Sequence, residues 1–180
     1  KNQDKVGLIL FSDRIVKYIP PRKGRTAVMR LVREVLAAEE TRHGTAIASA
    51  FRFLNNVQKH KAVVLLISDF MDRGYERELR VMAKKHDVIC CPISDPRELD
   101  LVDVGLVEVQ DPESGDLVLL DTSSRTVREA FRRQSEKENA DLQTMLRRLK
   151  VDCIFLSTAR PFIDDVRKMF RQRQVRAGRG

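Results

Sequence analysis

The sequence predicts an α/β domain built on a largely parallel central sheet. Continuous apolar runs at residues 6–12, 62–67 and 88–93 are typical of strands buried inside a sheet. Segments with helical apolar spacing separate these runs, and such alternation favours parallel strands joined by helices. No internal repeat or low-complexity linker interrupts the pattern, and 180 residues are enough to bury one core. We therefore expect a single α/β domain.

The first half of the chain should begin with two strands and two helices. Residues 6–12 predict a strand buried on both faces, and residues 14–20 an antiparallel edge partner that stops at Pro20 and Pro21. One apolar face at helical spacing marks the first helix: Val28, Leu31, Val32, Val35 and Leu36. The second helix has a similar face: Ile47, Ala50, Phe51 and Leu54. A strand at 62–67, a short helix marked by Leu79 and Met82, and a strand at 88–93 complete this half.

The second half predicts a hairpin followed by a long helix. Two strand-like runs, GLVEVQ and DLVLLD, flank the turn sequence DPESG. A helix from about residue 126 to 150 follows, and Thr126 with Glu129 three positions later fits a capping box. Residues 153–156 predict a last strand, and Pro161 suits the first turn of a last helix.

The net charge of +8 is concentrated at the C-terminus. Residues 166–180 contain six basic side chains and no acidic one: Arg167, Lys168, Arg171, Arg173, Arg176 and Arg179. We therefore divide the chain into a domain over residues 1–165, which is nearly neutral, and a basic tail over 166–180. Such a tail can bind nucleic acid or an anionic surface, or it can be a solvated, frayed terminus.

The remaining composition indicates a protein of a reducing compartment. No apolar run is long enough to span a membrane, and the first residues do not resemble a signal peptide, so we expect a cytoplasmic location. Three cysteines do not make a disulfide framework. Because Cys90 and Cys91 should point to opposite faces of a strand, a zinc site with His86 is disfavoured, and buried, inert thiols are expected.

Two oxygen-bearing side chains stand at the ends of predicted elements. Thr45 precedes the second helix in HGTAIASAF, and Asp69 directly follows the strand in KAVVLLISDF. Ligands bind at the carboxyl edge of such sheets, and Mg²⁺ or Mn²⁺ prefers hydroxyl and carboxylate ligands. Thr45 can instead be a helix N-cap, and Asp69 can cap the next helix or form a salt bridge. Together they indicate a divalent-cation site.

Other kinds of site have less support. PPRKGRTA lacks the spacing of a phosphate-binding loop, and no G-x-S-x-G elbow is present. The three histidines stand in polar contexts where exposed side chains are expected, which disfavours a nucleophilic hydrolase. A Mg²⁺-dependent hydrolase would need a general base, for which His43 is the candidate near Asp69.

The order of these motifs resembles a bacterial family of von Willebrand factor A-like proteins. The segments that carry the resemblance are VGLILFS, RIVKYIPPRKGR, HGTAIASAF, VVLLISDF and VGLVEVQDPESGDLVLLDT. The family is catalogued as domain of unknown function 58 and is associated with MoxR-type AAA+ ATPases. The resemblance implies a Rossmann-like fold with a metal-ion-dependent adhesion site, in which Thr45 and Asp69 would be the last two ligands.

The sequence departs from the family pattern at its start. The D-x-S-x-S loop that would supply the first three ligands is absent before Thr45, and the chain begins at what would be the second strand. In the fold that the resemblance implies, the first strand lies in the middle of the sheet. Its absence would expose sheet edges and apolar surface. We therefore expect the chain to be part of a longer protein, or its first strand and helix to be supplied separately.

The function predicted from these observations is protein interaction and not catalysis. Thr45 and Asp69 would hold Mg²⁺ or Mn²⁺, once the upstream ligands are present, and an acidic group of a partner protein would complete the metal shell. Arg42, His43 and Gly44 would form the rim of this site. The resemblance implies a MoxR-type ATPase as a partner, working in assembly or activation of other proteins. Any membrane association would come from segments outside this chain.

Overall fold

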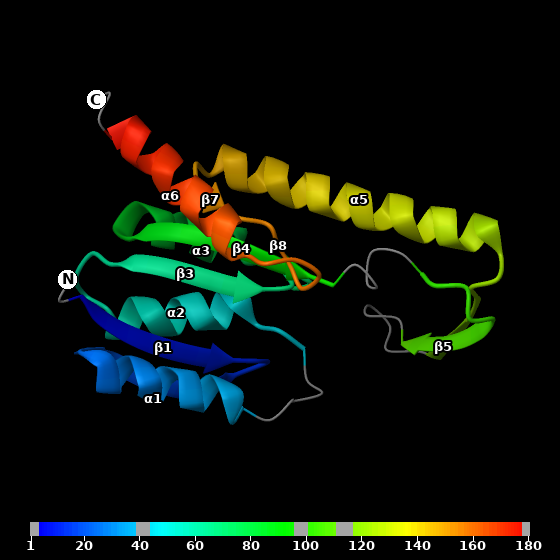
Figure 1. Ribbon diagram of the computed structural model, residues 1–180. Helices are drawn as coiled ribbons and strands as arrows, with labels where there is room; N and C mark the ends of the chain where they lie inside the picture. The colour runs from blue at the N-terminus through cyan, green and yellow to red at the C-terminus, as the bar shows by residue number, and fades with distance from the viewer. Residues whose placement is uncertain (1–3, 39–43, 96–100, 111–116, 178–180) are drawn as a thin grey trace. The chain divides into compact units, whose positions relative to one another are not determined.

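The strands and helices of the chain follow one another in the predicted α/β order (Figure 1). The structure is a computed structural model that describes residues 4–38, 44–95, 101–110 and 117–177. It divides into two compact units, each described here by itself. The first comprises Lys1–Val64 with Phe70–Val88, and the second comprises Leu65–Asp69 with Ile89–Gly180.

An antiparallel ribbon forms the centre of the first unit. Strand β1 (Lys5–Phe11) pairs with β2 (Ile15–Lys23), as predicted. The two backbones approach closely at Gly7, where an added Cβ would lie 2.9 Å from the carbonyl oxygen of Ile19, so only glycine fits. The prediction that β1 is buried on both faces is wrong. Its first residues are exposed, and no residue of the strand is fully buried.

Three helices complete the first unit: α1 (Arg25–Leu36), α2 (Ile47–Val57) and α3 (Glu76–Lys85). Helices α1 and α2 both contact the ribbon, and α3 contacts α2. The ring of Phe53 on α2 meets Tyr18 on β2 edge-on, with 5.3 Å between centroids. Ile47, Phe51, Leu79 and Met82 are buried to 2% exposure or less, so the core of this unit lies around α2 and α3.

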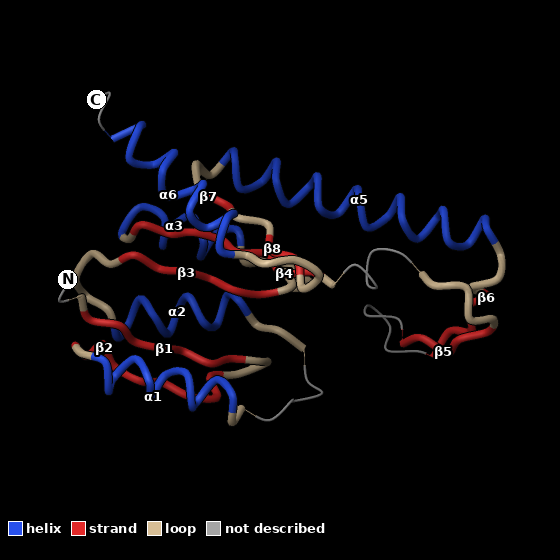
Figure 2. Tube along the Cα trace, in the orientation of Figure 1, coloured by secondary structure: helices blue, strands red, loops and turns tan. Residues whose placement is uncertain are grey.

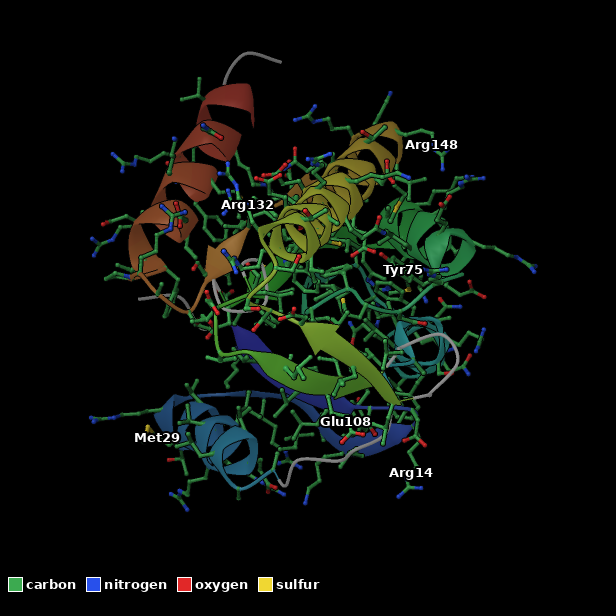
Figure 3. The ribbon with its side chains drawn as sticks, turned by 90° about the vertical axis from the view of Figure 1, so that its right-hand side faces the viewer. Arg14, Met29, Tyr75, Glu108, Arg132 and Arg148 are labelled. Carbon is green, nitrogen blue, oxygen red and sulfur yellow. The ribbon has the colours of Figure 1, made fainter. Side chains whose placement is uncertain are left out.

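Helix α1 departs from the predicted pattern of burial. Of the five apolar residues assigned to its core face, only Leu31 is buried. The others form an exposed stripe together with Met29, whose side chain points outward in Figure 3. The spacing correctly placed these residues on a helix, but among the described residues only Leu31 of the five is covered by other segments.

A four-stranded sheet forms the centre of the second unit (Figure 2). Strands β3 (Val63–Ser68) and β4 (Asp87–Ser94) each begin in the first unit and continue into the second. The strand order is β3-β4-β7, and β4 pairs in parallel with both β7 (Asp152–Cys153) and β8 (Leu156–Ser157). The single strand predicted at 153–156 is therefore two short ones.

Two helices belong to this unit: α5 (Arg125–Arg148) and α6 (Ile163–Ala177). The core cluster joins the sheet to α6 and contains Ile89, Cys91, Ile154 and Met169. Pro161 precedes α6 and does not lie in its first turn. The predicted capping box is also wrong, because α5 already begins at Arg125, one residue before Thr126.

The predicted hairpin is confirmed as β5 (Leu106–Gln110) and β6 (Leu117–Asp121), an antiparallel pair. The whole of its DPESG turn, residues 111–115, lies outside the described residues. The base of the hairpin is closed by Thr122, whose side chain is 1% exposed. Its hydroxyl donates to the carbonyl oxygen of Gly105 at 2.6 Å and accepts from the N–H of Val104 at 3.0 Å. In the described part of the chain, no helix has the length and apolar character needed to cross a bilayer.

Candidate functional site

Thr45 lies in a short segment that two hydrogen bonds fix in place. On its C-terminal side, Ala46 donates its N–H to the carbonyl oxygen of Ser12, just after β1, at 2.7 Å. The next residue, Ile47, donates its N–H to Oδ2 of Asp72 at 2.7 Å. All of these residues belong to the first unit, so the end of β1 and the Asp72 carboxylate together hold the entry to α2.

The hydroxyl of Thr45 does not cap α2. The N-cap residue is Ala46, and its side chain cannot accept a hydrogen bond, so Asp72 satisfies the Ile47 N–H from a distant segment. The alternative role of Thr45 as the N-cap is therefore wrong. Within the described residues, the half-buried Thr45 hydroxyl makes no hydrogen bond. It remains available to a ligand, and its role in a metal site stays a prediction.

Asp69 is an exposed carboxylate directly after β3. Its Oδ1 accepts a hydrogen bond from the hydroxyl of Ser68 at 3.2 Å. The following residue, Phe70, has a φ of 60°, which is uncommon for a bulky side chain. Phe70 is 8% exposed, and its ring lies edge-on to Tyr75 with 6.0 Å between centroids. Burial of this ring offsets the cost of the backbone conformation and fixes the turn that presents Asp69 to solvent.

The predicted site residues are distributed over both units. Thr45 belongs to the first unit and Asp69 to the second, so their joint action as metal ligands stays a prediction. Gly44 is exposed beside Thr45, whereas Arg42 and His43 lie outside the described residues. Mg²⁺ takes about six oxygen ligands, of which these two residues supply a minority. Across the described ranges, no group of three or more His, Cys, Asp or Glu side chains can hold a metal ion.

Sequence reasoning missed Asp72. The residue stands three positions after Asp69, and nothing local distinguishes it from an ordinary surface carboxylate. Its role depends on a contact with a residue 25 positions earlier in the chain. One feature of the sequence could have indicated such a residue. The side chain of Ala46 cannot accept a hydrogen bond from the first turn of the helix that follows it, so an acceptor from another segment was to be expected.

His86 corrects the expectation that the histidines are exposed, whereas His60 agrees with it. His86 is 3% exposed, its Nδ1 accepts the N–H of Ala62 at 3.3 Å, and its Nε2 is buried without a partner in the described structure. Burial, with a smaller contribution from the positive charge of Lys85, lowers the pKa of His86 below its ordinary value. The residue is therefore a neutral structural acceptor at pH 7.

The cysteines are buried or half-buried free thiols. Burial raises the pKa of Cys91 to about 11 and that of Cys153 to about 12, and it raises the pKa of Cys90 as well. Because the thiolate is the reactive form, thiols with such pKa values are poor nucleophiles at neutral pH.

Much of the predicted basic tail is helical. Residues 166–177 lie in α6, and Met169 is buried in the core cluster. Arg167 lies 3.8 Å from Asp164, and Arg173 lies 3.0 Å from Asp152. Lys168 and Arg171 are exposed. The side chain of Arg176 and the whole of Arg179 lie outside the part of the chain that the structure describes.

The chain is similar to proteins of mycobacteria. It is 26% identical over 174 residues to Uncharacterized protein Rv1480 of Mycobacterium tuberculosis, with 95% of this chain and 55% of that protein covered. It is 28% identical over 159 residues to Uncharacterized protein MAV169 of Mycobacterium avium, covering 87% of this chain and 94% of that protein. The chain thus spans about half the length of the longer curated relatives.

A solved structure shares the fold. It is described as an aerotolerance-related membrane protein from Bacteroides fragilis with multiple mutations to serines. The TM-score is 0.51 at 14% identity, over 88% of this chain and 74% of that chain, and a likeness at this identity concerns the fold alone. The family model, in contrast, matches residues 1–141 directly. The chain therefore belongs to the family described as protein of unknown function DUF58.

Proposed function

We propose that this chain is a protein-interaction domain of von Willebrand factor A type that binds its partner through a divalent cation. The observation that carries the proposal is the Thr45 hydroxyl, which makes no hydrogen bond in the described structure although its segment is held by Ser12 and Asp72. A hydroxyl that is held in place and does not cap a helix is suited to bind a metal ion. The exposed carboxylate of Asp69 at the end of a strand supplies the second oxygen donor.

The proposed role of the two side chains is to bind the metal ion while one of its coordination positions stays open. Mg²⁺ or Mn²⁺, when bound, would offer that position to a carboxylate of the partner. The remaining ligands would come from segments outside this chain, such as those of Rv1480, of which the match covers 55%. Binding of this kind needs no general base or nucleophile, so we propose no enzymatic activity.

The proposed partner is a MoxR-type AAA+ ATPase, acting with this domain in the assembly or activation of other proteins that present an acidic group. The name of the structural neighbour describes a membrane protein. We propose that association with a membrane would come from segments outside this chain, and that the domain itself works on the cytoplasmic side.

A thermal melt of the longer protein with and without Mg²⁺ or Mn²⁺ tests the proposal. A ligand that binds only the folded state, at 100 times its dissociation constant, adds about 2.7 kcal/mol of stability. We expect an upward shift in Tm that disappears in Thr45→Ala and Asp69→Ala. Asp72→Asn is the matched control, since it removes a neighbouring charge but keeps an acceptor for Ile47, and the metal shift should survive in it. A shift that survives both ligand-site substitutions would refute the site.

A further inference from the structure

We propose that a groove in the second unit binds an acidic, leucine-rich peptide segment of a partner protein. The groove has a volume of about 540 Å³ and lies between the end of α5, β7 and α6. It shares no residue with the Thr45 and Asp69 site, so the inference is independent of the metal proposal. Its lining residues are Gln143, Leu146, Arg147, Lys150, Val151, Asp152, Cys153, Phe155, Met169, Gln172 and Arg173.

The floor of the groove is apolar and firmly packed. Leu146 is 1% exposed, and Val151 and Met169 are each 7% exposed. Met169 also belongs to the core cluster of the unit, so the floor cannot collapse without disturbing the core. These three side chains are almost fully covered, so the apolar surface that a ligand can reach comes mainly from the half-buried Cys153 and Phe155. A small apolar side chain laid on that surface would gain contacts.

The rim of the groove carries an excess of positive charge. Its cations are Arg147, Lys150 and Arg173, and its one acidic lining residue is Asp152. Asp152 is engaged by Arg173, with 3.0 Å between Oδ2 and Nε. Arg147 contacts the side-chain oxygen of Gln143 at 3.3 Å, and Lys150 has no ion pair among the described residues. Two cations are thus available to an anionic ligand.

Lys150 occupies a backbone conformation in which glycine is usual. Its φ is 56°, and its backbone closes the end of α5. The N–H of Lys150 donates to the carbonyl oxygen of Arg147 at 3.0 Å, and the N–H of Val151 donates to the carbonyl oxygen of Leu146 at 3.0 Å. Glycine would satisfy this turn without strain. Lysine at this position instead places a cation at the mouth of the groove. Residues in such uncommon backbone conformations are often found at functional sites.

The lining favours a peptide over a small enclosed ligand. Gln143, Arg147, Lys150 and Gln172 leave the groove open along its rim. Small molecules are usually bound in cavities that cover most of their surface, whereas an extended chain can cross an open groove and place alternate side chains in it. Carboxylates of the peptide would meet Arg147 and Lys150, and a leucine between them would rest on the floor.

Fluorescence anisotropy with the full chain and a fluorescein-labelled (Glu-Leu)₄ peptide tests the proposal. Arg147→Gln and Lys150→Gly each remove an exposed cation from the rim, so each should weaken binding by about threefold to fivefold. Lys137→Gln is the matched control on the exposed surface of α5 and should change affinity by less than about twofold. Because Lys150→Gly relieves the backbone strain, its Tm should rise while its affinity falls, which separates lost binding from lost folding.

Several results would overturn the proposal. The first is the absence of measurable peptide binding by the unmodified chain. The second is an equal loss of affinity in Lys137→Gln, which would indicate long-range attraction to a basic protein and no defined groove. Equal binding of a (Lys-Leu)₄ peptide would exclude recognition of acidic groups. Displacement of the peptide by laurate at similar affinity would assign the groove to a small amphipathic carboxylate instead.

Discussion

The carboxylate of Asp72 accepts the backbone N–H of Ile47 at 2.7 Å, although 25 residues separate them in sequence. This contact ties the segment after Asp69 to the segment that carries Thr45. It also places a negative charge at the positive end of α2, where the helix dipole favours it. The second oxygen of Asp72 accepts the N–H of Arg73 at 2.7 Å, so both oxygens are engaged by backbone groups.

Replacing Asp72 should destabilise the protein without removing a metal ligand. Asp72→Ala leaves the Ile47 N–H without its cap, and loss of an N-cap acceptor costs about 0.5–2 kcal/mol. Asp72→Asn retains a side-chain acceptor and should lose clearly less. Urea denaturation followed by circular dichroism measures both differences. Equal losses in the two variants would show that charge, and not the hydrogen bond, is the important feature.

Helix α1 shows what apolar spacing can and cannot predict. The spacing placed Val28, Leu31, Val32 and Val35 on one side of a helix, and the helix is present at those positions. Only Leu31 is buried, whereas Val32 and Val35 are 44% and 50% exposed. Periodicity records which residues share a face, but burial depends on whether another segment covers that face. The strands and helices were therefore more predictable than their packing.

The candidate site was predictable to the same limited extent. Thr45 and Asp69 were found because each stands at an element boundary that a single sequence reveals. The capping role of Asp72 and the burial of His86 depend on contacts between residues more than twenty positions apart. Local sequence contains no information on such contacts, so reasoning from motifs assigned no role to Asp72 and placed His86 at the surface.

Thr122 should be essential for closing the base of the hairpin. Thr122→Val keeps the shape of the side chain but removes a hydroxyl that bonds both Gly105 and Val104. An unsatisfied buried polar group costs about 1–3 kcal/mol, so we expect destabilisation of that size. Hydrogen exchange of the amides of β5 and β6 should accelerate in parallel. Thr122→Ser keeps the hydroxyl and is the control; a loss as large as that in the valine variant would mean that packing of the methyl group dominates.

His86 should make the stability of the protein depend on pH. Burial holds its folded-state pKa below the ordinary value of 6.5, so the unfolded chain binds this proton more readily. The contribution of neutral His86 is therefore complete above about pH 6.5 and is lost as pH falls from there toward the lower folded-state pKa. Melting curves between pH 8 and pH 5, compared with those of His86→Asn, isolate this effect. Asparagine can accept the Ala62 N–H but does not titrate, so its profile should fall less steeply; identical profiles would contradict the prediction.

Strand β3 presents neighbouring apolar side chains to opposite environments. Leu66 is 5% exposed, whereas Ile67 is 57% exposed on the other face of the strand. In this chain Leu66→Ala should cost about 2–5 kcal/mol, while Ile67→Ala should change stability by no more than about 0.5 kcal/mol. If a longer protein covers this face with a further segment, as the length of Rv1480 allows, Ile67→Ala should become several times more costly there. Urea denaturation of both variants, in this chain and in the longer protein, measures the difference. An unchanged cost for Ile67→Ala in the longer protein would show that its face of β3 stays open to solvent or to a partner.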